Sequence, residues 1–175
     1  MDTDKQKIYR LGIKRKKDEI LLESLSDYDH IKLRLGEYSP DVPFKMRVSE
    51  GKTLYDVVGF QDTSNFAVSQ RLYSLFKNNN ISGLKFYEIL IEDVEEKYYG
   101  LQIIGKSGKL EHPSKIGFYV GLKFDYDSWD KSDVFSPEGT VSFFCNEKVR
   151  KILKENKITN IDIHNIDDIE GYSFG

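Results

Sequence analysis

The feature that most constrains this chain is an internal repeat with an offset of 77 residues. Residues 56–89 align with residues 133–166 without a gap. The matched pairs include Phe66 and Phe143, Lys77 and Lys154, Asn79 and Asn156, Ile81 and Ile158, and Ile89 and Ile166. Self-similarity of this kind is typical of one supersecondary unit that occurs more than once around a shared core.

Each copy is predicted to fold as a strand, a short helix and a second strand. A short apolar run opens each copy, at residues 66–68 and 143–145, as in a buried strand. Ser69 or Asn146 follows, and either side chain can accept a hydrogen bond from the first turn of a helix. Apolar residues then recur at helical spacing: Leu72, Leu75 and Phe76 in the first copy, and Val149, Ile152 and Leu153 in the second.

The expected end of each helix also repeats. Asn80 suits the left-handed position after a helix, which lets Ile81 pack back on Phe76, whereas Lys157 suits the corresponding position less well. Alternating apolar residues then predict a strand in each copy: Leu84, Phe86 and Ile89, and Ile161, Ile163 and Ile166. A chance match between two ordinary amphipathic helices is the alternative, but the agreement of cap, helix, stop and strand favours a duplication.

Composition indicates a single domain that comprises residues 1–175. A hydrophobic content of 39% suffices for one core and is marginal for two, and no Pro- or Ser-rich linker interrupts the chain. The aromatic share of 13% favours a sheet-rich protein. Residues 1–50 are expected to be β-rich, with strands at 8–13, 31–35 and 44–48. We therefore predict an α+β fold of mostly antiparallel sheets, with two equivalent short helices from an internal duplication.

Charge and cysteine content limit the compartment and the class of partner. The net charge is −3 and the pI about 5.7, which argues against a general nucleic-acid binder. Cys145 is the lone cysteine, so no internal disulfide can form and a reducing compartment is expected. No apolar run resembles a signal peptide or approaches the length of a membrane span. We expect a cytoplasmic protein that binds neither membrane nor nucleic acid.

Residues 100–107 match the pattern of a phosphate-binding loop, G-x-x-x-x-G-K-S, to the letter. That loop must follow a buried strand and open a helix, whose N–H groups hold the phosphates. Here an acidic turn precedes the motif, Ile103 and Ile104 favour a strand, and Pro113 opposes a following helix. We interpret the motif as a strand that ends in a glycine-rich hairpin.

No set of residues indicates a metal, a cofactor or a catalytic centre. Residues 125–130 begin like a calcium loop, but Trp129 and Asp130 occupy the positions of the third ligand and of the turn glycine. The three histidines, His30, His112 and His164, are scattered and have no second ligand at a suitable spacing. Cys145 corresponds to Val68 in the first copy, which indicates a core position.

The acidic segment 125–130 also contains Tyr126 and Trp129. Aromatic side chains bordered by charge are typical of protein-binding surfaces, because the ring provides contact area and the charge steers association. The alternative is that Trp129 is buried and that the aspartates solvate a loop. A second acidic run, residues 92–96, is expected to form a turn between two strands.

The repeat and its flanks resemble bacterial polymorphic-toxin immunity proteins, in particular a family formerly known only as a domain of unknown function. An Asp-apolar-Phe element corresponds to residues 133–135, and an apolar run with a capping Ser corresponds to residues 66–69. The family's L-x-x-L-L helix resembles residues 72–76, its Gly-apolar-x-Phe strand resembles residues 83–86, and Tyr98-Tyr99 resembles the start of its next strand. The second copy departs from the pattern, with Asn146 for Ser69 and Asn160 for Gly83.

The resemblance implies an antitoxin without enzymatic activity that binds a cognate toxin effector domain and blocks it. An acidic protein would associate rapidly with a basic toxin. The residues expected to contact the toxin are Asp125, Tyr126, Asp127, Trp129, Asp130, Glu92, Asp93, Glu95 and Glu96. Asp56 and Asp133 are interpreted as structural, and the oligomeric state stays open. The alternative function is an enzyme or small-molecule-binding module, which would need a deep cleft with convergent polar groups.

Overall fold

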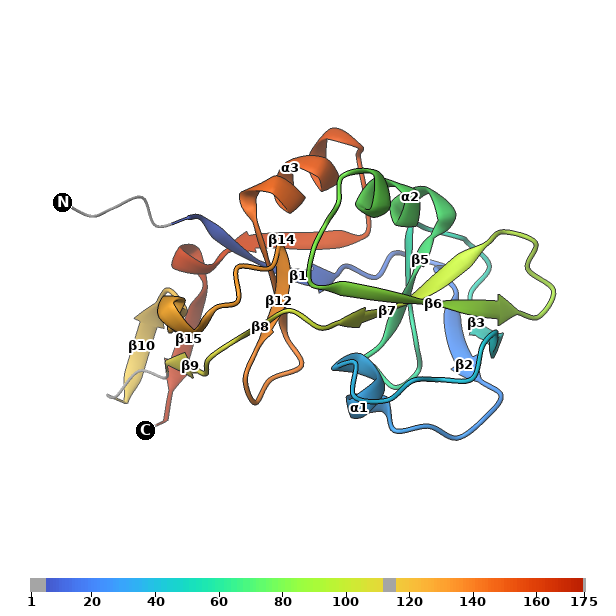
Figure 1. Ribbon diagram of the computed structural model, residues 1–175, viewed down its shortest axis with the longest axis horizontal. Coiled ribbons are helices and arrows are strands. Elements are labelled where there is room, and N and C mark those ends of the chain that lie inside the picture. Colours follow the sequence, from blue (N-terminus) through green and yellow to red (C-terminus); the bar gives the residue numbers. More distant parts are fainter. Residues whose placement is uncertain (1–5, 112–115, 175) are drawn as a thin grey trace.

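The computed structural model of the protein describes residues 6–111 and 116–174 (Figure 1). The first half contains β1 (Ile8–Ile13), β2 (Leu21–Ser24), α1 (His30–Arg34), β3 (Phe44–Glu50), β4 (Val57–Gly59), β5 (Phe66–Ser69), α2 (Gln70–Asn78) and β6 (Leu84–Ile91). The second half contains β7 (Tyr98–Ile103), β8 (Lys106–Ser107), β9 (Leu110–Glu111), β10 (Gly117–Val120), β11 (Lys123–Phe124), the 3-10 turn η1 (Tyr126–Ser128), β12 (Val134–Pro137), β13 (Phe143–Asn146), α3 (Glu147–Glu155), β14 (Ile161–Asn165), η2 (Ile166–Asp168) and β15 (Glu170–Ser173).

The strands form two larger sheets and two small ones. The six-stranded sheet has the order β2-β3-β6-β7-β5-β4, and the five-stranded sheet has the order β14-β1-β13-β12-β8. Pairing is antiparallel except between β3 and β6 and between β12 and β8. A bridge between Leu22 and Phe60 brings the edge strand β2 close to β4, so the six-stranded sheet nearly closes on itself. The predicted class, α+β with mostly antiparallel sheets, is confirmed.

The bounds of β5 and α2 recur 77 residues later as β13 and α3. The predicted caps are confirmed, because Ser69 Oγ accepts from the Leu72 N–H at 3.2 Å and Asn146 Oδ1 accepts from the Val149 N–H at 3.2 Å. The two helices lie next to each other on the same side of the molecule (Figure 1).

The predicted helix stops are also confirmed. Asn80 and Lys157 have φ angles of 50° and 53°, so both adopt the left-handed conformation. Ile81 N donates to Phe76 O at 3.0 Å, and Ile158 N donates to Leu153 O at the same distance. Both helices thus end in the same type of C-terminal cap.

One further strand in each sheet corresponds in register, although its position in the sequence differs. In the first sheet β7 lies between β5 and β6, and in the second sheet β1 lies between β13 and β14. Ser69 pairs with Tyr98 and Leu84 with Ile103, whereas the corresponding pairs of the second sheet are Asn146 with Ile8 and Ile161 with Ile13. Strand β1 therefore occupies the same position as β7, residue for residue.

The largest hydrophobic cluster joins the two strand–helix–strand units. It takes Leu72 and Phe76 from α2, and Val149 and Leu153 from α3, together with apolar residues of β1 and β7. Phe66 and Phe143, which correspond in the repeat, stack on each other with ring centroids 5.3 Å apart. Because both units cover this cluster, neither buries its apolar face alone.

Residues 31–35, predicted as a strand, are helical instead, and this prediction is wrong. Helix α1 begins after Asp29, whose carboxylate accepts from the Lys32 N–H at 2.9 Å. Leu33 and Arg34 are its buried residues, and they are adjacent rather than alternating. Five alternating residues are too few to separate strand from helix, and the cap at Asp29 decides between them.

Two other sequence expectations change in detail. Residues 116–124, expected as one strand, form β10 and β11, separated by Gly121, whose φ is 88°. The loop expected at residues 105–114 contains β8 and β9, and its residues 112–114 lie outside the described part of the chain. Strand β8 pairs with β12, so the motif at 100–107 does not end in a hairpin as predicted.

Candidate functional site

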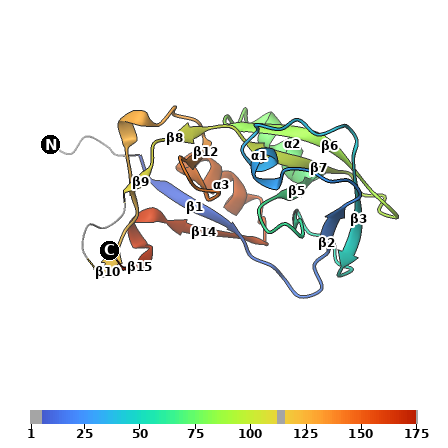
Figure 2. The ribbon, with the colours of Figure 1, turned by 90° about the horizontal axis from the view of Figure 1, so that it is seen from below.

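The two predicted acidic surfaces lie at opposite ends of the molecule. Residues 92–96 form the turn between β6 and β7, at the end that also carries β2 and β3 (Figure 1). Residues 125–130 surround η1, at the end that carries β9, β10 and β15 (Figure 2). A single compact contact cannot include both segments, so they are two separate candidate surfaces.

The segment 125–130 presents carboxylates on a backbone fixed by hydrogen bonds. Asp125 caps η1 and accepts from the Asp127 N–H at 3.0 Å. Asp130 accepts from the Lys106 N–H and from the Ser132 N–H, both at 2.9 Å. The side chains of Asp125, Asp127 and Asp130 are exposed. The segment is therefore a preorganised acidic surface, as a steering site requires.

Trp129 does not belong to that surface. Its side chain is 4% exposed and packs against Phe124 and Phe135, with ring centroids 6.3 and 5.0 Å away. The buried alternative therefore holds, and the prediction that Trp129 contacts a partner is wrong for this conformation. Tyr126 is half-buried and stacks on Phe124 at 4.3 Å. Burial, together with the nearby charge of Asp167, raises the pKa of Tyr126.

The turn at residues 92–96 is also exposed and acidic. The side chains of Glu92, Asp93, Glu95 and Glu96 are exposed, whereas Val94 packs on the core beneath them. Asp93 adopts a left-handed φ of 59° at the tip, which Asp tolerates better than most residues. The expected acidic turn is confirmed, and a role in binding stays a prediction.

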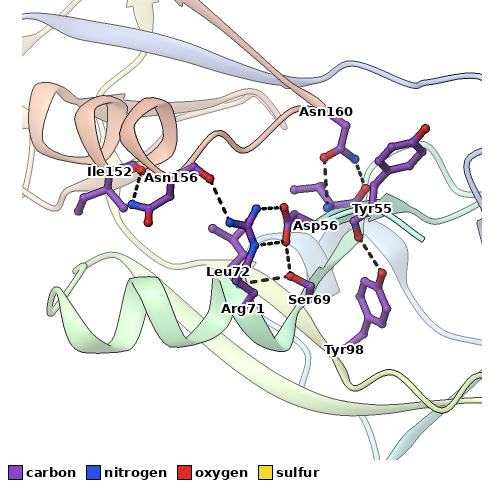
Figure 3. A network of polar contacts seen from close by, with 10 residues as sticks. Tyr55, Asp56, Ser69, Arg71, Leu72, Tyr98, Ile152, Asn156 and Asn160 are labelled. Carbon is purple, nitrogen blue, oxygen red and sulfur yellow. Dashed lines mark hydrogen bonds and ion pairs between the residues drawn. The ribbon is translucent and has the colours of Figure 1, made fainter. Parts of the chain in front are cut away.

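Asp56 joins the first unit to the second through a polar network (Figure 3). Its carboxylate accepts from Ser69 Oγ at 2.6 Å and from two nitrogens of Arg71, whose Nη1 donates to Asn156 O at 3.0 Å. Burial raises the pKa of Asp56, but the hydrogen bonds from Arg71 and Ser69 outweigh it and hold that pKa below its usual value. Each of these groups binds another part of the same chain, so the network fixes the fold.

A groove of about 730 Å³ lies between α1, the β8–β12 pair and the loop at residues 138–142. Gly105, Lys106 and Ser107 line it, together with Ser136 from β12. Gly105 N donates to Gly83 O at 3.1 Å and Lys106 N donates to Asp130 at 2.9 Å. These two N–H groups are therefore engaged within the protein and cannot hold a phosphate in the manner of a phosphate-binding loop.

The remaining candidate residues are separate from one another. His30 lies in α1 and His164 in β14, and His112 lies outside the described residues. Cys145 is fully buried in β13, and burial raises the pKa of its thiol far above the usual value. Within residues 6–111 and 116–174, no three His, Cys, Asp or Glu side chains are grouped to hold a metal ion. None of the helices in that part of the chain has the length and apolarity needed to span a bilayer.

Sequence reasoning missed an exposed apolar surface at the end of the molecule that also carries the segment 125–130. Strands β10 and β15 form a separate two-stranded sheet, and one of its faces carries large apolar side chains. Alternation could have indicated it, since Phe118 and Val120 alternate in one strand and Tyr172 and Phe174 alternate in the other. The tail at 167–175 was interpreted only as acidic, so its pairing with residues 117–120 was not foreseen.

No protein-family model matches the chain, and no curated protein matches it.

Proposed function

We propose that this chain is an immunity protein that binds a cognate bacterial toxin and neutralises it by protein–protein contact. The observation that carries the proposal is the acidic segment 125–130, where three exposed carboxylates stand on a backbone fixed by hydrogen bonds. A fixed segment loses little conformational freedom on binding. Clustered negative charge also accelerates association with a basic partner.

The proposal includes a duplication of the strand–helix–strand unit. It is supported by the recurrence of β5 and α2 as β13 and α3, by the shared helix ends, and by the matching register of β1 and β7. Tyr9, Leu11 and Ile13 of β1 then correspond to Tyr99, Leu101 and Ile103 of β7. Two copies of one unit would supply a rigid body with different loops at its ends, and the loops would carry the binding surfaces.

A pull-down from the native cell tests the function. The tagged protein is compared with a variant that combines Asp127→Lys with Asp125→Asn, because Asn retains the ability to cap η1. A matched control combines Asp27→Lys with Asp41→Asn, two exposed aspartates elsewhere on the surface, with the same change in charge. We expect the wild type and the control to capture a toxin domain in stoichiometric amount and the Asp127→Lys, Asp125→Asn variant to capture none. If no such domain is captured while the toxin is expressed, the proposal is wrong.

The second candidate function is a small-molecule-binding module or enzyme, and the groove favours it. The Ser136 side chain is buried at the groove, and its Oγ has no hydrogen-bond partner among the described residues. A buried hydroxyl without a partner is costly unless a ligand or water engages it. Native mass spectrometry of protein purified from its own cells checks this candidate. A stoichiometric adduct lost in Ser136→Val would support it, and a clean apo mass would reject it.

A further inference from the structure

We propose that the toxin docks on the exposed apolar face of the β10–β15 sheet and that the docking domain carries an apolar patch bordered by Lys and Arg. This inference rests on the proposed function and names the surface and the partner chemistry. It moves the centre of the contact from the acidic residues 125–130 to the β10–β15 sheet at the same end of the molecule.

The register of the small sheet places its apolar side chains on one face. Phe118 pairs with Tyr172 and Val120 pairs with Glu170, so these four side chains project to the same side. The exposed fractions are 71% for Ile116, 65% for Phe118, 57% for Val120, 57% for Tyr172 and 85% for Phe174. Single exposed apolar residues are ordinary, but three large ones on two paired strands, with Ile116 and Phe174 directly flanking those strands, form a patch typical of an interaction surface.

The opposite face of the sheet carries Tyr119, whose side chain is half-buried. Tyr119 lies over Gly171, where an added Cβ would come within 2.4 Å of its ring. Gly121 N donates to Ile169 O and Leu122 N donates to Ile166 O, each at 2.8 Å. These bonds fasten β10 to the body of the protein through η2. The β10–β15 sheet lies at one end of the molecule and is attached there by these hydrogen bonds (Figure 2).

Acidic side chains accompany this patch. Glu170 lies on the same face, beside Val120, and the exposed Asp167 and Asp168 precede β15. Ile166 of η2 belongs to the same hydrophobic cluster as Trp129 and Tyr126, which places η2 near the segment 125–130. The patch and the carboxylates of both turns thus belong to one end of the protein.

Among the described residues, Lys106, Lys109, Lys123 and Lys131 are cations at this end, and Lys131 is already engaged within the protein. Lys131 Nζ donates to Tyr126 O at 3.0 Å and lies 4.9 Å from the centre of the Trp129 ring. Lys123 is exposed on β11. The surface therefore combines an apolar centre with a charged border that includes the carboxylates of Asp167, Asp168 and Glu170, the arrangement of a protein interface with a hydrophobic core and a polar rim.

This charge distribution decides between the occupants that an apolar face could accept. A second copy of this chain would bring the carboxylates of Asp167, Asp168 and Glu170 near their own equivalents, which costs free energy at a self-complementary contact. An anionic membrane surface would be repelled by the same carboxylates. A basic domain with an apolar patch would pack against the apolar centre of the surface and attract the carboxylates at its border.

Site-specific photo-crosslinking in the native cell tests the inference. A benzophenone amino acid replaces Phe118 in one variant and Tyr172 in another, because both side chains are exposed and the replacement keeps them aromatic. A third variant carries the probe at Leu90, near the acidic turn 92–96, and a fourth at Val42; both positions are exposed. Circular dichroism of each purified variant verifies the fold.

We expect adducts with one domain at Phe118 and Tyr172 and none at Val42. The crosslinked peptide should contain apolar residues with flanking Lys or Arg, and the yield should fall several-fold in 0.5 M salt. The captured domain is then purified as the probe for affinity measurements. Phe118→Ser combined with Tyr172→Ser should weaken its binding by at least tenfold, whereas Val42→Ser should change it less than twofold.

The alternative outcomes separate this inference from the proposed function. An adduct with a toxin domain at Leu90 alone would overturn the inference and leave the proposed function in place. An adduct with a second copy of the chain, or with lipid, would also overturn the inference. No adduct at any position, together with no captured toxin in the pull-down, would overturn both.

Discussion

In the first unit Asp56 is bound by two nitrogens of Arg71 and by Ser69 Oγ, whereas in the second unit Asp133 accepts from Lys148 Nζ at 3.2 Å and from the Asn146 amide at 2.7 Å. The acids, the caps and the cations occupy corresponding positions, 77 residues apart. The guanidinium binds through two nitrogens, and the ammonium acts as a single point charge. The two units thus have the same backbone arrangement, but different side chains stabilise it.

The same comparison applies to the contacts that cross between the units. Arg71 of the first unit donates to Asn156 O at the end of α3, and Lys148 of the second unit donates to Asn80 O at the end of α2, at 3.4 Å. Each helix therefore carries a cation that neutralises the C-terminal end of the other helix. The two units therefore share this reciprocal packing, although the residues that make the contacts differ.

The largest expected effect comes from the position where the units differ most, Gly83 in the first and Asn160 in the second. Gly83 has a φ of 84°, and an added Cβ would lie 1.8 Å from Val134 O. Gly83→Ala should lower the free energy of unfolding by about 3 kcal/mol or more, through a left-handed backbone and a steric clash. Urea denaturation measures the loss. Gly139→Ala is the control, since Gly139 has a φ of 76° but no atom near an added Cβ; equal losses would contradict the steric account.

The corresponding residue of the second unit depends on its side chain instead. Asn160 is fully buried, donates to Val57 O and to Glu19 at 3.1 Å, and accepts from Val57 N at 3.3 Å. Asn160→Ala should cost about 2–4 kcal/mol, because it leaves buried polar groups without partners. Thermal unfolding and urea titration measure the loss. Asn156→Ala removes one half-buried hydrogen bond from the side-chain amide to Ile152 O and should cost about 1 kcal/mol. A larger loss for Asn156→Ala than for Asn160→Ala would contradict this expectation.

A smaller effect should appear at Asp56 and depend on pH. The pKa of Asp56 in the folded protein lies below its value in the unfolded chain. The stability that the Asp56 carboxylate contributes is therefore fully present above the unfolded pKa and is lost as the pH falls through the folded pKa. Asp56→Asn should cost about 1 kcal/mol at pH 7, a modest figure because the group is partly exposed. Stability measured from pH 7 to pH 2 should decline less steeply in the variant than in the wild type.

Asp133→Asn is the matched comparison for Asp56. Its pKa is held below the usual value, because hydrogen bonds from Ser82, Asn146 and Lys148 outweigh the effect of burial. We expect a smaller loss than for Asp56→Asn, since a point charge binds the carboxylate less tightly than a guanidinium fork. A larger loss of stability for Asp133→Asn would show that the hydrogen bond from the Asn146 side chain contributes more than the Lys148 cation.

The smallest expected effect is at the helix ends. Lys157 adopts a left-handed φ of 53°, which Lys disfavours. Asn80 occupies the corresponding position of the first unit, and Asn tolerates this conformation better. Lys157→Asn should raise the free energy of unfolding by about 0.5–1 kcal/mol. The reverse change, Asn80→Lys, should lower it by a similar amount. Denaturant titrations in parallel measure both, and equal signs for the two variants would refute the correspondence of the two ends.

The candidate binding surface was predictable only in part. Aspartates at 125, 127 and 130 are exposed as expected, because a run of charges without apolar periodicity stays in water. The position of Trp129 was undecidable from sequence, since an aromatic residue between charges fits a core and a contact surface equally well. Local alternation marks the apolar residues of β10 and β15, but the pairing that joins them into one face links strands about fifty residues apart, and no local pattern reveals that pairing.

The sequence by itself determined the local structure of the repeat. Caps at Ser69 and Asn146, the apolar stripes of α2 and α3, and the left-handed ends at Asn80 and Lys157 all follow from interactions within a few residues. Only the tertiary structure decided the long-range pairing. Strand β1 takes in the second sheet the place that β7 takes in the first, and Leu33 and Arg34 of α1 are buried against distant segments. Strand order reflects the burial of apolar faces against distant segments, and that free energy is not encoded at any one position.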